Sequence, residues 1–309
     1  MRNLAIPLLA SILALLPAPA AARTGPAYYA ALAQQEARIA AIAWRLTTAN
    51  AGWCPETAQQ PGWVLGDLHR FKQSERTAAS ETYGATDGPF VAAVAAGSPA
   101  ERAGLTRGTR IKAINGEAIA QVGDEPTIRI DTIIVKLATL DPAAAWTVTD
   151  AGGRLYRIAP APGCASAFRI ELRGAQAAAN GILVRLTLKL AQSVDADDEL
   201  AAVLAHELAH NILRHRDRLG NDRSAARVRQ TELAADRLSV WLMADAGYDP
   251  AAAIRFWERH SRPLIRDASH PPRSERIAAI ETEKAAMQAA RAGDPAARPV
   301  WIGAPLTLE

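Results

Sequence analysis

The chain has 309 residues, of which 49% are hydrophobic and 22% are charged. This balance is that of a folded globular protein and excludes a disordered or fibrous one, while the length predicts two domains. The net charge is +3, and the basic residues are scattered along the chain. The concentrated basic face of a nucleic-acid-binding protein is therefore not expected, and no nucleic-acid partner is predicted.

The first 22 residues have the three parts of a secretory signal. A positive start at Arg2 precedes an apolar run over 4–16, and Ala20-Ala21-Ala22 supplies a small-residue cleavage site. A retained membrane anchor is the alternative, but prolines interrupt the run and it falls short of the ~20 residues that a spanning helix needs. We therefore expect an exported protein with no membrane span after cleavage, located in the periplasm, with secretion as the alternative.

Cys54 and Cys164 are the two cysteines of the chain. Disulfides persist in exported proteins, so the simplest expectation is that the two side chains are paired. Two separate thiols are the alternative. A bridge would tie the end of the N-terminal helix to the start of the second half of the chain.

Residues 26–50 are predicted to form a helix because their large apolar residues recur at helical spacing. Gly52-Trp53-Cys54-Pro55 should end this helix, and the stretch to about Gly66 is expected to be turn-rich. The apolar residues that carry the helical pattern are Leu32, Ile39, Ile42 and Leu46.

From about Tyr83 the chain changes to short apolar runs separated by glycine and proline. Asn115-Gly116 between two such runs predicts a tight hairpin. The region 128–140 should end in a helix, and 146–158 should form a second hairpin around Gly152-Gly153. These features predict a small, strand-rich module with one or two helices.

This module resembles a bacterial PDZ domain over about residues 80–160. The resemblance is carried by Gly88-Pro89-Phe90-Val91, by Gly97-Ser98-Pro99-Ala100 leading to Ala103-Gly104-Leu105, and by Gly108-Thr109-Arg110-Ile111 leading to Ile114-Asn115-Gly116. PDZ domains bind extended peptides by strand addition, so the resemblance implies a peptide-binding site at Gly88, Phe90 and Val91.

Two residues depart from the PDZ pattern. Pro89 has no N–H to donate, and Asp87 brings a negative charge to the place where a terminal carboxylate would dock. Capture of a free C-terminus is therefore not expected. Binding of an internal segment and a purely structural role both stay open.

After Cys164, residues 168–172 and 182–188 alternate like strands around an Asn180-Gly181 turn, and the rest of the chain is helical to about residue 291. Residues 195–219 are predicted to form one helix, with Asp195 as its cap and acidic residues in its first turn. Those acidic residues are Asp197, Asp198 and Glu199.

The helix over 195–219 carries His206-Glu207-Leu208-Ala209-His210. Histidines four residues apart are offset by only ~40° around an α-helix, so both imidazoles can reach one metal ion. Glu207 lies ~60° from His210, beside the metal and not on it. This spacing predicts a zinc site with Glu207 as the base that activates water.

A catalytic zinc ion takes three protein ligands and keeps one position for water. The next predicted helix, 224–246, offers Glu232 as the third ligand for one zinc ion per chain. Asp236 shares its face and would accept a hydrogen bond from the far nitrogen of a ligand histidine. The remaining histidines have no partner at ligand spacing and are interpreted as surface residues: His69, His215 and His260.

Residues 165–285 resemble the gluzincin metallopeptidases of the HtpX and CAAX prenyl protease type, metallopeptidase family forty-eight. Besides the two helical motifs, the resemblance includes 198–205, 246–250 and 269–272 with Arg276. It implies hydrolysis of peptide bonds by zinc without a retained membrane domain. It also implies that His270 faces the cleft, either steadying the oxyanion or moving onto zinc. Arg276 would lie behind the metal, with a structural salt bridge as the alternative.

These features predict an α+β protein, in which a mainly helical gluzincin domain with a small sheet follows a strand-rich PDZ-like domain. The expected segments are a signal peptide at 1–22, a helix and linker at 23–79, the PDZ-like domain at 80–162, the metallopeptidase domain at 163–290 and a tail at 291–309.

The predicted function is that of a zinc metalloendopeptidase acting on exported or misfolded proteins. One alternative is a peptide-binding quality-control factor that is non-catalytic, or self-inhibited until an activating partner arrives. Another is a zinc hydrolase of cell-wall amides.

Overall fold

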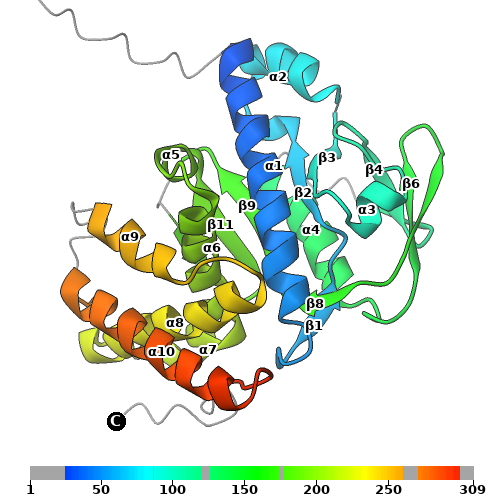
Figure 1. Ribbon diagram of the computed structural model, residues 1–309. Coiled ribbons are helices and arrows are strands. Elements are labelled where there is room, and N and C mark those ends of the chain that lie inside the picture. Colours follow the sequence, from blue (N-terminus) through cyan, green and yellow to red (C-terminus); the bar gives the residue numbers. More distant parts are fainter. Residues whose placement is uncertain (1–24, 86, 120–125, 174–176, 260–270, 300–309) are drawn as a thin grey trace, which may run out of the picture.

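The computed structural model describes residues 25–85, 87–119, 126–173, 177–259 and 271–299 (Figure 1). Its helices are α1 (Pro26–Ala49), α2 (Arg76–Tyr83), α3 (Pro99–Arg102), α4 (Pro126–Ala138), α5 (Leu188–Ser193), α6 (Asp197–Ile212), α7 (His215–Leu219), α8 (Ala225–Asp245), α9 (Ala251–Arg259) and α10 (Arg273–Gly293). Within these ranges, no helix combines the length and the apolar character needed to cross a membrane.

The strands are β1 (Thr57–Gln59), β2 (Trp63–Asp67), β3 (Pro89–Val94), β4 (Ile111–Ile114), β5 (Glu117–Ala118), β6 (Trp146–Asp150), β7 (Leu155–Ile158), β8 (Pro162–Cys164), β9 (Ala167–Glu171), β10 (Ala177–Ala179) and β11 (Leu183–Thr187). The strand-rich region lies at about residues 57–171, and the described chain after Thr187 is helical. The predicted α+β fold is thereby confirmed.

Helix α1 lies between the strand-rich part and the helical part of the molecule (Figure 1). It contacts β2 and β3 on one side and β9, α6 and α8 on the other. The predicted apolar positions from Leu32 to Leu46 are at most 2% exposed, which confirms the helical interpretation of residues 26–50. Burial of this stripe on both sides makes α1 the common wall of the two parts.

The strand-rich part contains an antiparallel sheet of order β5-β4-β6-β7 and a separate antiparallel pair, β2-β3. The predicted Asn115-Gly116 hairpin joins β4 to β5. Both residues have positive φ, 50° and 78°, as the commonest two-residue hairpin turn requires. Helix α4 covers this part, with Ile133 fully buried against Ile114 and Val148 in one apolar core.

The stretch expected to be turn-rich before Gly66 contains two short strands. β1 pairs with β8, and β2 pairs with β3. The strand-rich part thus begins well before residue 80, where the sequence suggested a boundary. The partners of β1 and β2 lie far along the chain, so local turn signals outweighed a pairing that only the tertiary structure reveals.

The helical part contains a three-stranded sheet of order β10-β11-β9, in which β9 and β11 are parallel and β10 is an antiparallel edge. Helix α6 packs against α8 and against this sheet. The Asn180-Gly181 turn joins β10 to β11, as predicted, with Gly181 at a φ of 106°.

The prediction of one helix over 195–219 is wrong. Helix α6 starts at Asp197 after Ala196, without a side-chain cap, and ends at Ile212. Arg214 then adopts a left-handed conformation with φ of 54°, and α7 starts at His215. This turn breaks the helical axis, so that both Leu213 and His215 are buried.

Cys54 and Cys164 form a disulfide across 110 residues. The bridge joins the end of α1 to β8, immediately before the chain enters β9. The predicted pairing is confirmed, and the closed loop contains the strand-rich part of the molecule.

Candidate metal centre

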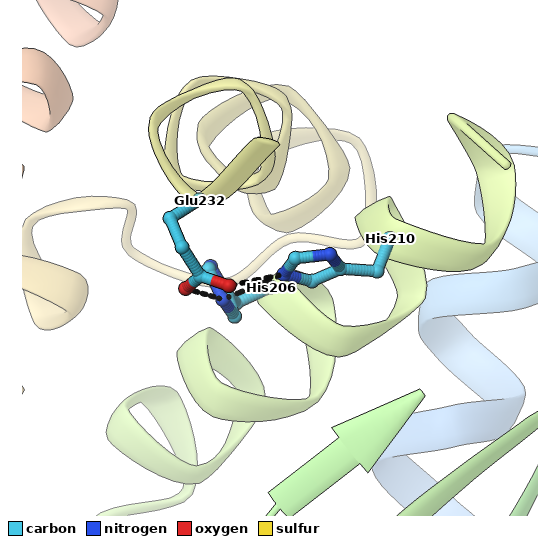
Figure 2. A group of neighbouring side chains, drawn as sticks. All are labelled: His206, His210 and Glu232. Atoms are coloured by element: carbon cyan, nitrogen blue, oxygen red, sulfur yellow. Dashed lines mark hydrogen bonds and ion pairs between the residues drawn. The ribbon is translucent and has the colours of Figure 1, made fainter. Parts of the chain in front are cut away.

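Three side chains from two helices converge on one point in the helical part (Figure 2). The Nε2 atoms of His206 and His210, both on α6, are 3.1 Å apart. Glu232 on α8 approaches them with its two carboxylate oxygens, at 3.4 Å from His206 Nε2 and 3.5 Å from His210 Nε2. Atoms bound at 2.0–2.2 Å to a tetrahedral ion lie about 3.3–3.6 Å from one another. The two histidine–carboxylate distances lie in this range, and the distance between the two Nε2 atoms is about 0.2 Å shorter. The three residues therefore suit a zinc ion in ligand chemistry and approximate geometry.

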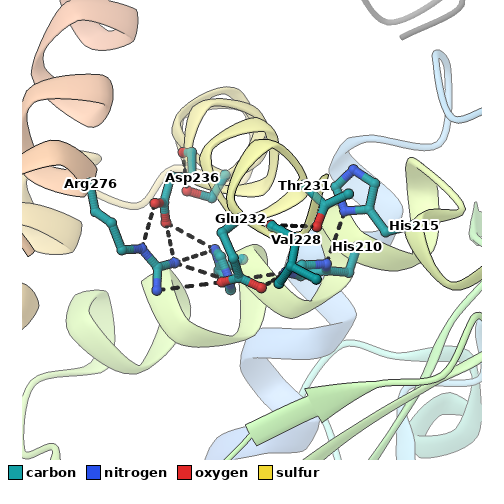
Figure 3. Close-up of polar contacts among 9 residues, drawn as sticks. His210, His215, Val228, Thr231, Glu232, Asp236 and Arg276 are labelled. Carbon is teal, nitrogen blue, oxygen red and sulfur yellow. Dashed lines mark hydrogen bonds and ion pairs between the residues drawn. The ribbon is translucent and has the colours of Figure 1, made fainter. Parts of the chain in front are cut away.

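Asp236 and Arg276 form a buried ion pair next to the metal centre (Figure 3). Asp236 is 2% exposed, and its Oδ1 lies 3.0 Å from His206 Nδ1. Arg276 on α10 donates to both carboxylate oxygens of Asp236 at 2.6 Å, and its Nη1 lies 3.5 Å from Glu232. A carboxylate on the far nitrogen fixes His206 with Nε2 free for a metal. Asp236 and Arg276 thus lie where the sequence and the resemblance suggested.

His215 has the corresponding position behind His210. Its Nδ1 lies 2.9 Å from His210 Nδ1, and it is only 2% exposed. The expectation that His215 is a surface residue is wrong, because the turn at Arg214 folds α7 back against α6. If Nε2 of His210 faces a metal, its Nδ1–H donates to Nδ1 of His215.

Charge and burial prepare the two kinds of ligand differently. Burial lowers the pKa of His210 to about 4, so the ring is neutral near pH 7, as a metal ligand must be. Burial opposes ionisation of Glu232, but His210 and His206 outweigh it and hold the pKa of this carboxyl below its usual range. His210 and Glu232 therefore have the protonation states that bind a divalent cation. Burial also opposes protonation of His206, but Asp236 and Glu232 outweigh it and raise the pKa of this ring to about 9, so a cation bound here would displace a proton from His206.

Glu207 does not join the three converging side chains but lines the same cavity, which has a volume of about 850 Å³. Burial raises the pKa of Glu207 to about 7, against the opposing effect of His206. A carboxyl group of this kind beside a metal position suits a general base.

The edge strand β10 and the turn after it form one wall of this cavity. Asn211, the residue after His210, connects that wall to the metal centre. Its Oδ1 accepts a hydrogen bond from the Gly181 N–H at 2.7 Å, and its Nδ2 donates to Ser166 Oγ at 2.8 Å. Sequence reasoning missed Asn211 and His215. The recurrence of histidine five residues after His210 was a usable signal for His215, whereas Asn211 gave none.

His260 and His270 lie outside the described residues. The roles suggested for His270, at the oxyanion or on zinc, stay predictions.

The residues expected to bind a peptide in the strand-rich part lie within its core. Phe90 and Val91 are 0% exposed. Strand β3 pairs with β2 on one edge, while on the other the Val91 N–H donates to Thr109 O and Val91 O accepts from the Gly108 N–H. A peptide cannot add to a strand paired on both edges. The assignment of Gly88, Phe90 and Val91 to a peptide site is therefore corrected.

His69 belongs to a charged cluster near Gly88 and is not a free surface residue as expected. Its Nδ1 lies 3.1 Å from Asp67 and 3.2 Å from Asp87. Arg129, at the start of α4, pairs with fully buried Asp67 at 2.8 Å. Asp87 therefore interacts with side chains of the same protein.

Among the described residues, the unpaired edge of the β2-β3 pair belongs to β2, and β2 contacts α4. A cavity of only about 70 Å³ remains between Leu65 on β2 and Ile134 on α4. Trp44 of α1 and Phe168 of β9 also line this cavity. The space beside β2, where a peptide strand would add, is therefore filled by the protein's own α1 and β9.

Two segments of the chain match known families. Residues 174–221 and 219–284 match the model of Peptidase family M48, and residues 90–128 match a PDZ domain. Neither the curated proteins nor the solved structures gave a significant match. The first match covers the whole metal centre, from β10 to Arg276, and the second covers β3 to the start of α4.

Proposed function

Because the chain belongs to the M48 family of metallopeptidases and carries a PDZ domain before its peptidase region, we propose that it is a zinc-dependent endopeptidase. His206, His210 and Glu232 would hold the zinc ion, and Glu207 would be the catalytic base. The observation that carries the proposal is the spacing of 3.1, 3.4 and 3.5 Å among the three ligand side chains.

Each residue around the centre has a distinct role in this proposal. When bound, zinc supplies a Lewis acid that polarises the scissile carbonyl and makes water a nucleophile near neutral pH. Glu207 takes a proton from the attacking water and delivers it to the leaving amine. Asp236 and His215 hold the two ligand imidazoles in the required tautomer and orientation. Arg276 compensates the charge of Asp236, so that this carboxylate remains buried without being protonated.

The edge strand β10 supports an extended polypeptide as the substrate. The cavity runs along Ala177–Ala179 on this edge, and an extended chain can add to an unpaired strand through backbone hydrogen bonds. Backbone pairing does not depend on sequence. Unfolded segments of exported or misfolded proteins are therefore the substrates that we propose.

The proposed location is the periplasm or another compartment outside the cytoplasm. Two observations support it. Residues 1–22 have the composition of a secretory signal, and the two cysteines form a disulfide, which persists in oxidising compartments.

Metal analysis combined with proteolysis tests the proposal. Purified wild type, Glu207→Gln and the exposed control Glu281→Gln are assayed for zinc content and for cleavage of an unfolded protein. All three are expected to bind about one zinc ion per chain, while Glu207→Gln loses about 10²- to 10⁴-fold in the rate of cleavage.

Normal proteolysis by Glu207→Gln would remove Glu207 from the mechanism. Zinc binding without proteolysis by wild type, together with hydrolysis of cell-wall amides, would replace the peptidase by the alternative zinc hydrolase.

A further inference from the structure

Arginine dominates the charged residues of the active-site cavity away from the metal centre. Arg185 on β11, Arg216 on α7, Arg223 before α8 and Arg273 on α10 all line it. The acidic residues among the described lining belong to the centre itself: Glu207, Glu232 and Asp236. Outside that group, the described walls of the cavity carry only positive formal charges.

These four arginines differ from the other arginines next to the cavity and the sheet. Arg276 is paired with Asp236. Arg169, which lies on β9 directly opposite Arg185, is paired with Asp131 and Glu171. In contrast, no ion pair is found for the four among the residues that the structure describes. Within the described part of the chain, Arg216 and Arg273 donate to backbone carbonyls, those of Asn180 and Glu258.

Arg185 is partly buried, whereas the other three arginines are exposed. The Nε of Arg185 is shielded from water but has no hydrogen-bond partner among the described residues. Arg185 and the proposed base Glu207 both line this cavity. Keeping part of a guanidinium away from water without an acidic partner costs free energy. A ligand that supplies an anion there would remove this cost.

The register of the sheet places Arg185 beside a small residue of the edge strand β10. Arg185 lies directly opposite Ala178 on β10, so both side chains project from the same face of the sheet. The neighbours Ala177 and Ala179 also have only methyl side chains. A chain added to the outer edge of β10 would therefore meet no large side chain between itself and the guanidinium.

We propose that Arg185 is a specificity-determining residue that binds a carboxylate of the substrate, with Arg216, Arg223 and Arg273 attracting acidic segments to the cavity. The inference rests on the proposed peptidase function and adds its substrate class, an acidic peptide. Arginine binds carboxylates through two parallel N–H donors. Several positive charges along one cavity increase the local concentration of negatively charged ligands. The carboxylate is that of an aspartate or glutamate side chain or that of the peptide's C-terminus.

Three fluorogenic peptides of otherwise identical sequence distinguish these sources. The first has internal glutamates and an amidated C-terminus, the second has glutamine in their place, and the third has glutamine and a free C-terminal carboxylate. Wild type is expected to cleave a carboxylate-bearing peptide with kcat/KM about 10- to 100-fold above the neutral one, the range of a charged hydrogen bond. Arg185→Gln should reduce this ratio to about one, whereas the exposed control Arg157→Gln should keep it.

Peptide binding to zinc-loaded Glu207→Gln gives a second measurement that needs no turnover. The peptide with internal glutamates, or the one with the free carboxylate, should bind at least about 10-fold more tightly than the neutral peptide, and the difference should shrink with added salt. Equal kcat/KM for the three peptides, or an unchanged ratio in Arg185→Gln, would overturn the role of Arg185 and leave the peptidase proposal intact. If wild type cleaves none of the peptides and no unfolded protein, the peptidase proposal fails instead, and the binding ratios alone decide the role of Arg185.

Discussion

Two regions of this protein have the components of a peptide site, but only one of them has room for a peptide. The cavity beside the metal centre has a volume of about 850 Å³ and runs along a free strand edge. The space beside β2 in the PDZ domain is reduced to about 70 Å³ by α1 and β9. The same architectural element, an edge strand facing a helix, is thus open in the peptidase part and closed in the PDZ part.

The two regions also differ in whether their charged side chains are paired. In the PDZ domain, Arg129 on α4 is paired with Asp67, and Asp131 on the same helix is paired with Arg169 of β9. In the peptidase cavity, Arg185 has no such partner among the described residues. Internally satisfied charges indicate a structural brace, and unsatisfied ones indicate a surface prepared for a ligand. The PDZ domain of this chain therefore supports α1 and β9, on which the peptidase part is built.

Replacement of a metal ligand should have the largest effect and should act on one region only. His206→Ala removes one of three ligands, so zinc binding and proteolysis are both expected to be lost. The PDZ domain, which contributes no ligand, should keep its fold. Zinc content, proteolysis and tryptophan fluorescence of the variant check this expectation. Retained proteolysis would show that the three side chains are not the metal site.

Loss of the disulfide should have the next largest effect and should act on both regions together. The bridge closes a loop of 110 residues, and in the chain-entropy account such a loop stabilises by about 4–5 kcal/mol. We expect Cys54→Ser with Cys164→Ser to lower the free energy of unfolding by about that amount, measured in urea. Because α1 packs on both regions, proteolysis and fluorescence should be lost in one transition. Two separate transitions would mean that the regions are not coupled.

The comparison also shows what the sequence can predict. His206, His210, Glu232 and Asp236 lie in short motifs on two helices, and helical geometry alone indicates which side chains share a face. His215 was missed because its approach to His210 depends on the left-handed turn at Arg214, which has no strong local signal.

Strand pairing explains the error in the PDZ domain. Phe90 and Val91 have the local pattern of a strand that could accept a peptide, but the chain's own segments at 63–67 and 108–110 occupy both of its edges. Those partners are set by tertiary packing, and no spacing within residues 80–160 reveals the first of them. The role proposed for Arg185 likewise could not be predicted from the sequence, because a single basic residue in a strand gives no signal until the cavity around it is known.

A pair of adjacent substitutions on α4 tests whether the space beside β2 is closed. Ile134 is 9% exposed and lines the small cavity, whereas Val135 is 51% exposed. If the groove is part of the core, Ile134→Ala should lower the free energy of unfolding by about 2–5 kcal/mol, and Val135→Ala should change it by about 0.5 kcal/mol or less. Urea unfolding measures both. Equal, small effects would indicate an open groove that is available to a peptide.

The finest test concerns the residue behind His210. His215→Ala removes the partner of His210 Nδ1 while leaving all three ligands in place, so we expect about 10- to 100-fold weaker zinc binding. Competition with a chromogenic chelator measures this affinity without reference to proteolysis. His69→Ala, which alters a histidine of the PDZ domain, is the matched control and should leave zinc affinity unchanged.

The two variants together show which of the two histidines, His215 or His69, affects zinc affinity. Each ring is held by its Nδ1, His215 by His210 at 2.9 Å and His69 by Asp67 at 3.1 Å. Only the first contact leads to the metal centre. Unchanged zinc affinity in His215→Ala would mean that packing against α7, and not the ring contact, orients His210. Weaker zinc affinity in both variants would mean that the charged cluster around His69 in the PDZ domain also influences the metal centre.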